Sequence, residues 1–154
     1  MLVVVDGIGL LVRGKSGTGK SGCALELVRR GHRLVADDVV EIRDEAVHER
    51  LLGSPPAAIA GRLEVQDVGI VEVATLFGPD ALAASHPVDV VIDLVPVASG
   101  KHRPRHVDLP SPAHLLGHTL PTYVVHGPDV TSVANRLEVI ARTVRTARSP
   151  RTGA

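Results

Sequence analysis

The feature that most constrains this chain is the run from Gly14 to Ser21, GKSGTGKS. It matches the phosphate-binding loop pattern G-x-x-x-x-G-K-[ST] at every fixed position. The apolar residues 8–12 before it are typical of a buried strand. After it, apolar residues at helical spacing continue to Gly31, a natural helix C-terminus. Strand, glycine-rich loop and helix together predict an α/β P-loop fold.

The residue types in this loop suit a triphosphate ligand. Glycines let successive backbone N–H groups point at phosphate oxygens, and the helix N-terminus adds partial positive charge. Lys20 can reach the β- and γ-phosphates, and the hydroxyl of Ser21 can hold Mg²⁺. We therefore predict ATP and Mg²⁺ as ligands. The residues expected to bind the nucleotide are Gly14, Ser16, Gly17, Thr18, Gly19, Lys20 and Ser21.

Composition excludes several other classes of protein. The net charge of the 154 residues is zero with histidines neutral, and Phe77 and Tyr123 are the only Phe, Tyr or Trp residues. Nucleic-acid binding is disfavoured, because neither a broad basic surface nor stacking aromatics are present. No apolar run has the roughly 20 residues of a membrane span. Cys23 is the only cysteine, which fits a reducing cytoplasm, and we interpret it as a packing residue.

Two adjacent carboxylates form a second candidate site. Asp37 and Asp38 lie in the run 33–42, whose apolar residues predict a strand. P-loop enzymes hold a metal-binding acid in such a setting, and a carboxylate can also act as general base toward a substrate hydroxyl. Neighbouring side chains on a strand point to opposite faces, so the pair can share one site only if the strand ends or bulges there. A solvated turn is the alternative interpretation.

The rest of the chain predicts one domain over residues 1–148 and a disordered tail at 149–154. Asp6-Gly7 predicts a tight turn joining two antiparallel strands. Pro110, Pro112 and Pro121 predict a loop-rich stretch, and an apolar stripe with helical spacing predicts a long C-terminal helix after Asp129. Further expectations are a turn at 44–45, strands near 47, 63–65, 70–73, 88–95 and 121–126, and a basic flank of Arg136, Arg142, Arg145 and Arg148 on the last helix.

The chain resembles the catalytic domain of HPr kinase/phosphorylase in a short, divergent form. The resemblance rests on 14–21 and on the run GHRLVADDVVEI at 31–42, which is far more specific than the P-loop alone. It continues through 53–56 and 63–70 to Leu76-Phe77-Gly78. The family implies a mixed β-sheet with flanking helices, related to the P-loop core of phosphoenolpyruvate carboxykinase. It also implies bacterial cytoplasmic enzymes, typically hexameric, that phosphorylate a seryl side chain on the phosphocarrier HPr, many of them reversing the reaction by phosphorolysis.

The resemblance also implies roles for single residues. It assigns catalysis to Lys20, Arg105 and the Asp37/Asp38 pair, without deciding which aspartate is the base. It assigns Mg²⁺ to Ser21, Asp38 and Glu64. Family members carry a catalytic histidine about one residue before the position of Met1.

Some positions depart from the family pattern. Gln66 and Asp67 stand where the family has arginine and glycine, and 125–132 lacks the two cations that the family associates with phosphorolysis. These losses make phosphorolysis doubtful. Two alternatives stay open: a related kinase for another protein or a small hydroxylated molecule, and a nucleotide-binding regulatory module without transfer activity.

Overall fold

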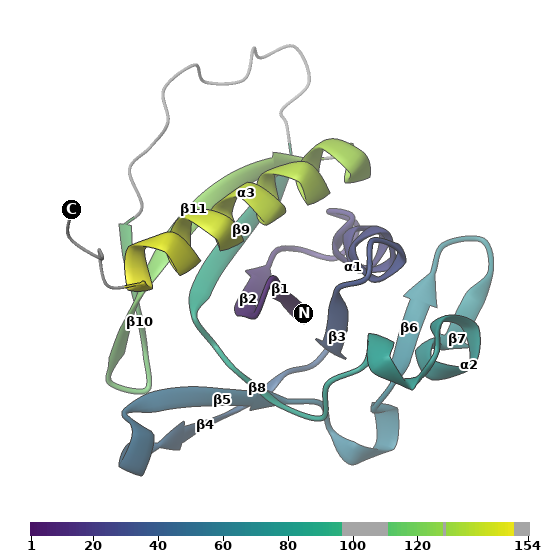
Figure 1. The fold of residues 1–154 in the computed structure, drawn as a ribbon. Coiled ribbons are helices and arrows are strands. Elements are labelled where there is room, and N and C mark those ends of the chain that lie inside the picture. Colours follow the sequence, from purple (N-terminus) through teal and green to yellow (C-terminus); the bar gives the residue numbers. More distant parts are fainter. Residues whose placement is uncertain (97–110, 128, 150–154) are drawn as a thin grey trace.

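A mixed β-sheet forms the centre of the computed structural model, which describes residues 1–96, 111–127 and 129–149 (Figure 1). Over these residues the sheet has the strand order β10-β11-β9-β2-β1-β3. β9 runs parallel to β2 and β11, and the other pairs are antiparallel. The predicted α/β class with a mixed sheet is confirmed. Its strands are β1 (Leu2–Val5), β2 (Ile8–Arg13), β3 (Arg33–Ala36), β9 (Val90–Pro96), β10 (Ser111–Leu115) and β11 (His118–Gly127).

Two layers cover the faces of this sheet. The helices α1 (Lys20–Arg29) and α3 (Val130–Arg148) lie on one face, and a small antiparallel sheet lies on the other (Figure 1). Beside them project the hairpin β6 (Arg62–Val65) and β7 (Gly69–Glu72) and the short helix α2 (Val73–Phe77). The small sheet consists of β4 (Glu41–Glu45), β5 (Arg50–Ser54) and β8 (His86–Pro87).

β1 separates two hydrophobic cores. Val3 and Val5 pack in the core beneath the helices, whereas Leu2 and Val4 pack against the small sheet. All four side chains are at most 3% exposed. Burying each contributes on the order of 1.5–3 kcal/mol, so this fully apolar strand anchors both layers.

The predicted turn between the first two strands is confirmed. Asp6 and Gly7 both have positive φ, 50° and 81°, as a two-residue hairpin turn requires. Gly9 follows on β2, where a Cβ atom would lie 1.9 Å from the carbonyl oxygen of Pro87. The small sheet therefore crosses β2 closely, at a position that only glycine can occupy.

The predicted strand over 33–42 is wrong as a single element. β3 ends at Ala36, the chain bends at Asp37-Asp38, and β4 begins at Glu41 in the other sheet. A strand continuing through the pair would direct one carboxylate to each covered face, which is costly without a partner. The bend removes that conflict and leaves both aspartates at the edge of the main sheet.

Three weaker expectations are also wrong. Residues 44–45 belong to β4, and Val47 lies in the 3₁₀ turn Ala46–His48 that joins β4 to β5. The proline-containing stretch from 111 onward forms the hairpin β10–β11. Pro112 is tolerated because β10 is an edge strand, and Pro121 comes just before the part of β11 that pairs with β9.

The C-terminal helix is confirmed, and two of its arginines hold it to the sheet. Arg142 Nε donates to Asp6 Oδ2 at 2.9 Å, and Arg148 Nη1 donates to Asp89 Oδ1 at 2.5 Å. Two of the four arginines of the predicted basic flank therefore form ion pairs within the chain. Among the described residues, no helix is both long enough and apolar enough to cross a membrane.

Replacing Asp89 with alanine is expected to lower the free energy of unfolding by about 2–4 kcal/mol. The buried carboxylate accepts the Gly9 N–H at 2.6 Å as well as the Arg148 guanidinium, so its loss leaves the Gly9 N–H unpaired and Arg148 with only the Asp89 backbone carbonyl. Urea unfolding measures the change. The exposed Asp80 on the same chain is the control, and Asp80→Ala should stay within about 0.5 kcal/mol of the wild type. An unchanged urea midpoint for Asp89→Ala would contradict the expectation.

Candidate functional site

The phosphate-binding loop connects β2 to α1, as the motif predicts. Gly17 and Gly19 have φ of 83° and 91°, in the region that favours glycine. A Cβ atom at Gly14 would lie 2.7 Å from the carbonyl oxygen of Leu94 and 2.9 Å from Thr18 Oγ1. The glycines are therefore needed for the shape of the loop, which curls over the end of the parallel strands.

Lys20 lies back across this loop. Its Nζ donates to the carbonyl oxygens of Gly14 at 2.5 Å and of Lys15 at 3.1 Å. Thr18 Oγ1 donates to the same Lys15 carbonyl at 2.8 Å, which holds the turn closed. The ammonium group thus sits over the concave side of the loop, where a phosphate would meet both the cation and the amino end of α1.

Ser21 and Asp37 lie in direct contact. Ser21 Oγ is 2.9 Å from Asp37 Oδ1 and 3.1 Å from Oδ2, and the Glu64 backbone N–H donates to Oδ2 at 3.2 Å. The bend after β3 therefore places one aspartate against the first turn of α1. Asp37 links the P-loop helix to β6, although the two are far apart in sequence.

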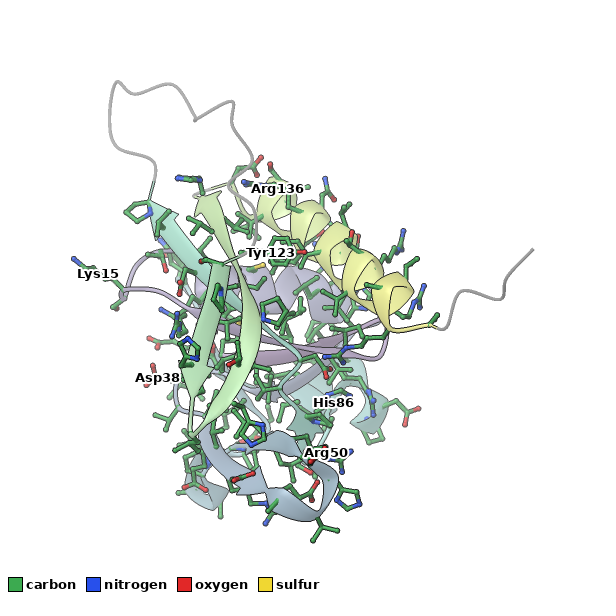
Figure 2. The ribbon with its side chains drawn as sticks, turned by 90° about the vertical axis from the view of Figure 1, so that its left-hand side faces the viewer. Lys15, Asp38, Arg50, His86, Tyr123 and Arg136 are labelled. Carbon is green, nitrogen blue, oxygen red and sulfur yellow. The ribbon has the colours of Figure 1, made fainter. Side chains whose placement is uncertain are left out.

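Asp38 makes no such contact with Ser21, and both aspartates line a small pocket of about 170 Å³. The Asp38 side chain is exposed, and in the described part of the chain no hydrogen bond or ion pair engages the carboxylate. Figure 2 shows Asp38 on the same side of the molecule as Lys15 of the P-loop. The pocket is lined by Asp37, Asp38, Pro55, Ile59, Arg62, Glu64 and Ile70.

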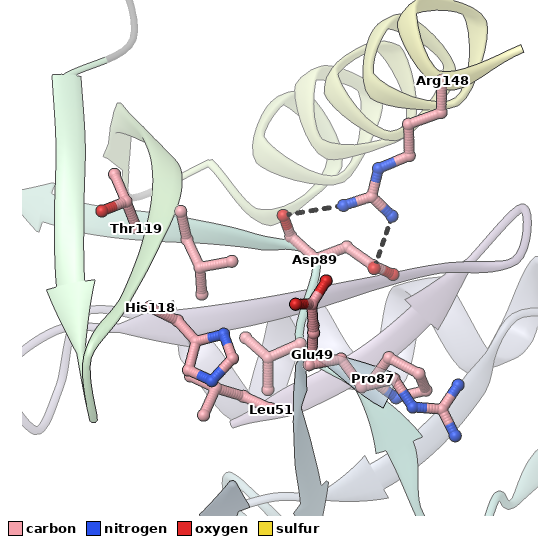
Figure 3. Close-up of a pocket in the computed structure, with 10 residues that line it drawn as sticks. Glu49, Leu51, Pro87, Asp89, His118, Thr119 and Arg148 are labelled. Atoms are coloured by element: carbon pink, nitrogen blue, oxygen red, sulfur yellow. Dashed lines mark hydrogen bonds and ion pairs between the residues drawn. The ribbon is translucent and has the colours of Figure 1, made fainter. Parts of the chain in front are cut away.

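A larger cavity of about 380 Å³ lies elsewhere, under the end of α3 (Figure 3). Val88 and Asp89, which line this cavity, directly precede β9, whereas the P-loop directly follows β2. Because β2 and β9 run parallel, the cavity and the P-loop lie at opposite ends of these strands. The two arginines that line the cavity are already paired, since Arg148 binds Asp89 and Arg50 binds Glu45, and the imidazole of His118 contacts Asp44. We therefore take the smaller pocket beside the P-loop as the candidate site.

The oxygen atoms around Ser21 suit Mg²⁺. Among the described residues, no group of three or more His, Cys, Asp or Glu side chains forms a preorganised metal cage. Mg²⁺ commonly takes only one or two protein carboxylates and completes its shell with phosphate and water oxygens. The Ser21 hydroxyl and the Asp37 carboxylate provide such a pair, whereas the exposed Glu64 contacts Asp37 through its backbone N–H.

Cys23 lies just inside α1 and is 1% exposed. Burial raises the pKa of its thiol to about 12, so the thiolate is scarce at neutral pH. A packing role, as the sequence suggested, accounts for this residue.

The sequence also singles out Arg105 and Gln66. Arg105 lies outside the described residues. Gln66 is exposed in the turn between β6 and β7.

Sequence reasoning missed several residues at the site. Arg13, directly before the P-loop, pairs with Asp93 on β9 through two hydrogen bonds of 2.8 and 3.0 Å. The pocket residues Ile59, Arg62 and Ile70 were also missed. Arg13 and Asp93 are neighbours only through the parallel register of β2 and β9, and nothing local in the sequence signals that contact.

Comparison with known proteins identifies close relatives. The family model described as the HPr serine kinase C-terminal domain matches residues 1–153. A solved structure titled as the Hpr(Ser) kinase/phosphatase from Coxiella burnetii superposes with a TM-score of 0.83 at 30% identity. The superposed region covers 95% of this chain and 88% of the Coxiella chain.

Curated bacterial proteins named HPr kinase/phosphorylase are more similar in sequence. The protein of Bacillus velezensis is 49% identical over 105 residues, which is 68% of this chain and 34% of the relative. That of Geobacillus thermodenitrificans is 53% identical over 94 residues, which is 61% of this chain and 30% of the relative. The matched region is thus about a third of the length of these relatives.

Proposed function

We propose a serine kinase activity for this chain on one premise: the chain belongs to the HPr serine kinase C-terminal domain family. The proposed reaction transfers the γ-phosphoryl group of ATP to a seryl hydroxyl of the phosphocarrier HPr. The names of the relatives support a kinase as the class of enzyme and HPr as its partner.

The contact between Ser21 and Asp37 carries the proposal. A glycine-rich loop alone is compatible with many nucleotide-binding proteins. Here the P-loop hydroxyl lies 2.9 Å from the Asp37 carboxylate, and a second, exposed carboxylate, that of Asp38, lines the same pocket as Asp37. One acid beside the metal-binding hydroxyl and another accessible to an acceptor is the arrangement that phosphoryl transfer to a hydroxyl requires.

Different residues of the loop bind different parts of Mg·ATP in this proposal. The backbone N–H groups of Gly17 and Gly19, with the ammonium of Lys20, bind and orient the phosphates, and Thr18, whose N–H and hydroxyl both donate to the Lys15 carbonyl, keeps the loop closed around them. Ser16, which is exposed in the same loop, is proposed to bind the phosphates as well. Ser21 and Asp37 would hold Mg²⁺, and Glu64, which lines the same pocket as Asp37, would supply a further carboxylate. When bound, Mg²⁺ neutralises charge on the phosphate oxygens.

Asp38 is the base in this proposal. Its carboxylate accepts the proton of the seryl hydroxyl as the Oγ–Pγ bond forms and the bond from Pγ to the departing ADP breaks. The contacts favour this division over an assignment of Mg²⁺ to Asp38, because Asp37 is the aspartate engaged with Ser21. Arg105 stays a proposed cation for the transferring group.

Further properties are proposed from the family. We place the protein in the bacterial cytoplasm as a homo-oligomer, with a hexamer as the expected form. Phosphorolysis is not part of the proposal, because 125–132 lacks the cations that the family associates with it.

Incubation with γ-labelled ATP and HPr tests the proposal. Labelled phosphoserine is expected on HPr in the presence of Mg²⁺ and is expected to fall to background when EDTA removes the metal, because the triphosphate then loses its neutralising cation. Mass spectrometry of the product identifies the modified residue. ATP binding without label on HPr would remove HPr as the acceptor, and absence of ATP binding would reject the kinase assignment.

A further inference from the structure

A cluster of exposed apolar side chains borders the candidate pocket. Of the large apolar residues that are exposed in the described part of the chain, half fall between 59 and 77. Val68 and Ile70 are each 71% exposed, and both belong to the β6–β7 hairpin and its turn. We name this cluster the apolar rim. Its members are Ile59, Val68, Ile70, Leu76 and Phe77.

The rim is continuous with the pocket that holds the carboxylates. Ile59 and Ile70 line that pocket together with Asp37 and Asp38, and α2, which carries the last two rim residues, directly follows β7. Isolated exposed apolar residues are ordinary on a protein surface, but a group of them beside an acidic pocket marks a contact surface. Whatever brings a hydroxyl to Asp38 must therefore cover part of the rim.

The size of the pocket limits what enters it. Its volume of about 170 Å³ is well below the roughly 300–1,000 Å³ of sites that enclose a small-molecule ligand. A single short side chain fits, and the rest of the substrate must lie outside, against the rim. This favours a protein acceptor over a free small molecule.

The charges around the rim further limit which acceptor sequences can bind. Asp38, Glu64 and Asp67 are all exposed there. The nearby cation Arg62 is already paired, since its Nε donates to Glu72 at 3.0 Å. Acidic residues beside the accepted serine would be repelled by these carboxylates.

We propose that the apolar rim is the docking surface for the acceptor protein, which presents its serine within an apolar segment free of acidic residues. The inference rests on the proposed kinase function and adds the residues that select the acceptor. Val68 and Ile70 are its central contacts, because they are the most exposed rim residues and lie on the hairpin that forms one wall of the pocket.

The double variant Val68→Ser/Ile70→Ser tests the proposal in the phosphorylation assay. The KM for HPr should rise about tenfold or more with the Kd for Mg·ATP unchanged, because the lost contacts bind the acceptor protein rather than the nucleotide. Both side chains are exposed, so folding should persist. Val139→Ser is the matched control, because Val139 is 62% exposed on α3, outside the rim, and its KM should stay at the wild-type value.

A binding experiment separates this inference from the kinase assignment. Fluorescent peptides with serine between leucines should bind the wild type, and the double variant should lose about tenfold in affinity, even if HPr is never phosphorylated. Equal affinity for peptides with serine between glutamates would overturn the inference. So would a double variant whose KM is unchanged but whose sedimentation shifts from oligomer to monomer, which would assign the rim to self-association.

Discussion

Replacing Lys20 with alanine is expected to reduce phosphoryl transfer to HPr by about a thousandfold. Removing a preorganised charged or hydrogen-bonding group aimed at developing phosphate charge typically costs 10²–10³ or more in kcat. In this chain the ammonium already points across the concave side of the P-loop, bound to the Gly14 and Lys15 carbonyls. Those carbonyls face solvent when the side chain is removed, so the fold should be retained. Label incorporation and urea unfolding measure the two effects.

Lys15 provides a matched control for this experiment. It occupies the same loop but is exposed, and it contributes its backbone carbonyl rather than its side chain to the contacts of the loop. Lys15→Ala should therefore keep activity within a few-fold of the wild type, while it removes the same formal charge. If Lys20→Ala stayed within tenfold of the wild type, or if both variants lost activity equally, the role assigned to Lys20 would be wrong.

The P-loop could be predicted because its determinants are local. In this loop Gly17 and Gly19 occur where the backbone has positive φ, Gly14 occurs where a Cβ atom would clash, and the apolar run before them forms β2. The turn at Asp6-Gly7 and the helix that ends before Gly31 follow from similarly short signals. Each of these features is decided by residues within one or two turns of chain, so the sequence alone was sufficient.

The errors in the fold arose where pairing between distant segments decides the structure. The apolar pattern of 33–42 favours a single strand, but β3 pairs with β1 and β4 pairs with β5, so the chain changes sheets at Asp37-Asp38. Pro112 suggested a loop, but an edge strand tolerates a missing N–H. Local propensity cannot show which strand will have an unpaired edge.

At the candidate site, too, some features follow from local sequence and others depend on contacts between distant segments. Adjacent aspartates predicted a site at 37–38, yet the separate surroundings of the two carboxylates depend on the position of α1 and β6. The apolar rim depends on β6 and β7 forming a hairpin whose outer side chains lack a covering element in the described structure. Exposure of Val68 and Ile70 could not be read from a pattern that equally suits a buried strand.

Comparison of Asp37→Asn with Asp38→Asn should distinguish the metal ligand from the base. Each substitution is expected to lower kcat by about 10²–10⁴, the range for loss of an acid–base group. Only Asp37→Asn should raise the Mg²⁺ concentration needed for half-maximal activity, because only Asp37 lies against the Ser21 hydroxyl. Steady-state kinetics over a Mg²⁺ titration measures both quantities.

Ser21→Ala extends this comparison to the other side of the same contact. If Ser21 and Asp37 hold one metal ion, Ser21→Ala should raise the Mg²⁺ requirement as Asp37→Asn does, and the two effects should be less than additive in the double variant. Asp38→Asn should leave the Mg²⁺ requirement unchanged, because the Ser21 hydroxyl donates to Asp37 and not to Asp38. Asp80→Asn, at an exposed acid outside the site, controls for loss of charge. A raised Mg²⁺ requirement in Asp38→Asn alone would exchange the roles of the two aspartates, and full activity in both variants would remove the pair from the mechanism.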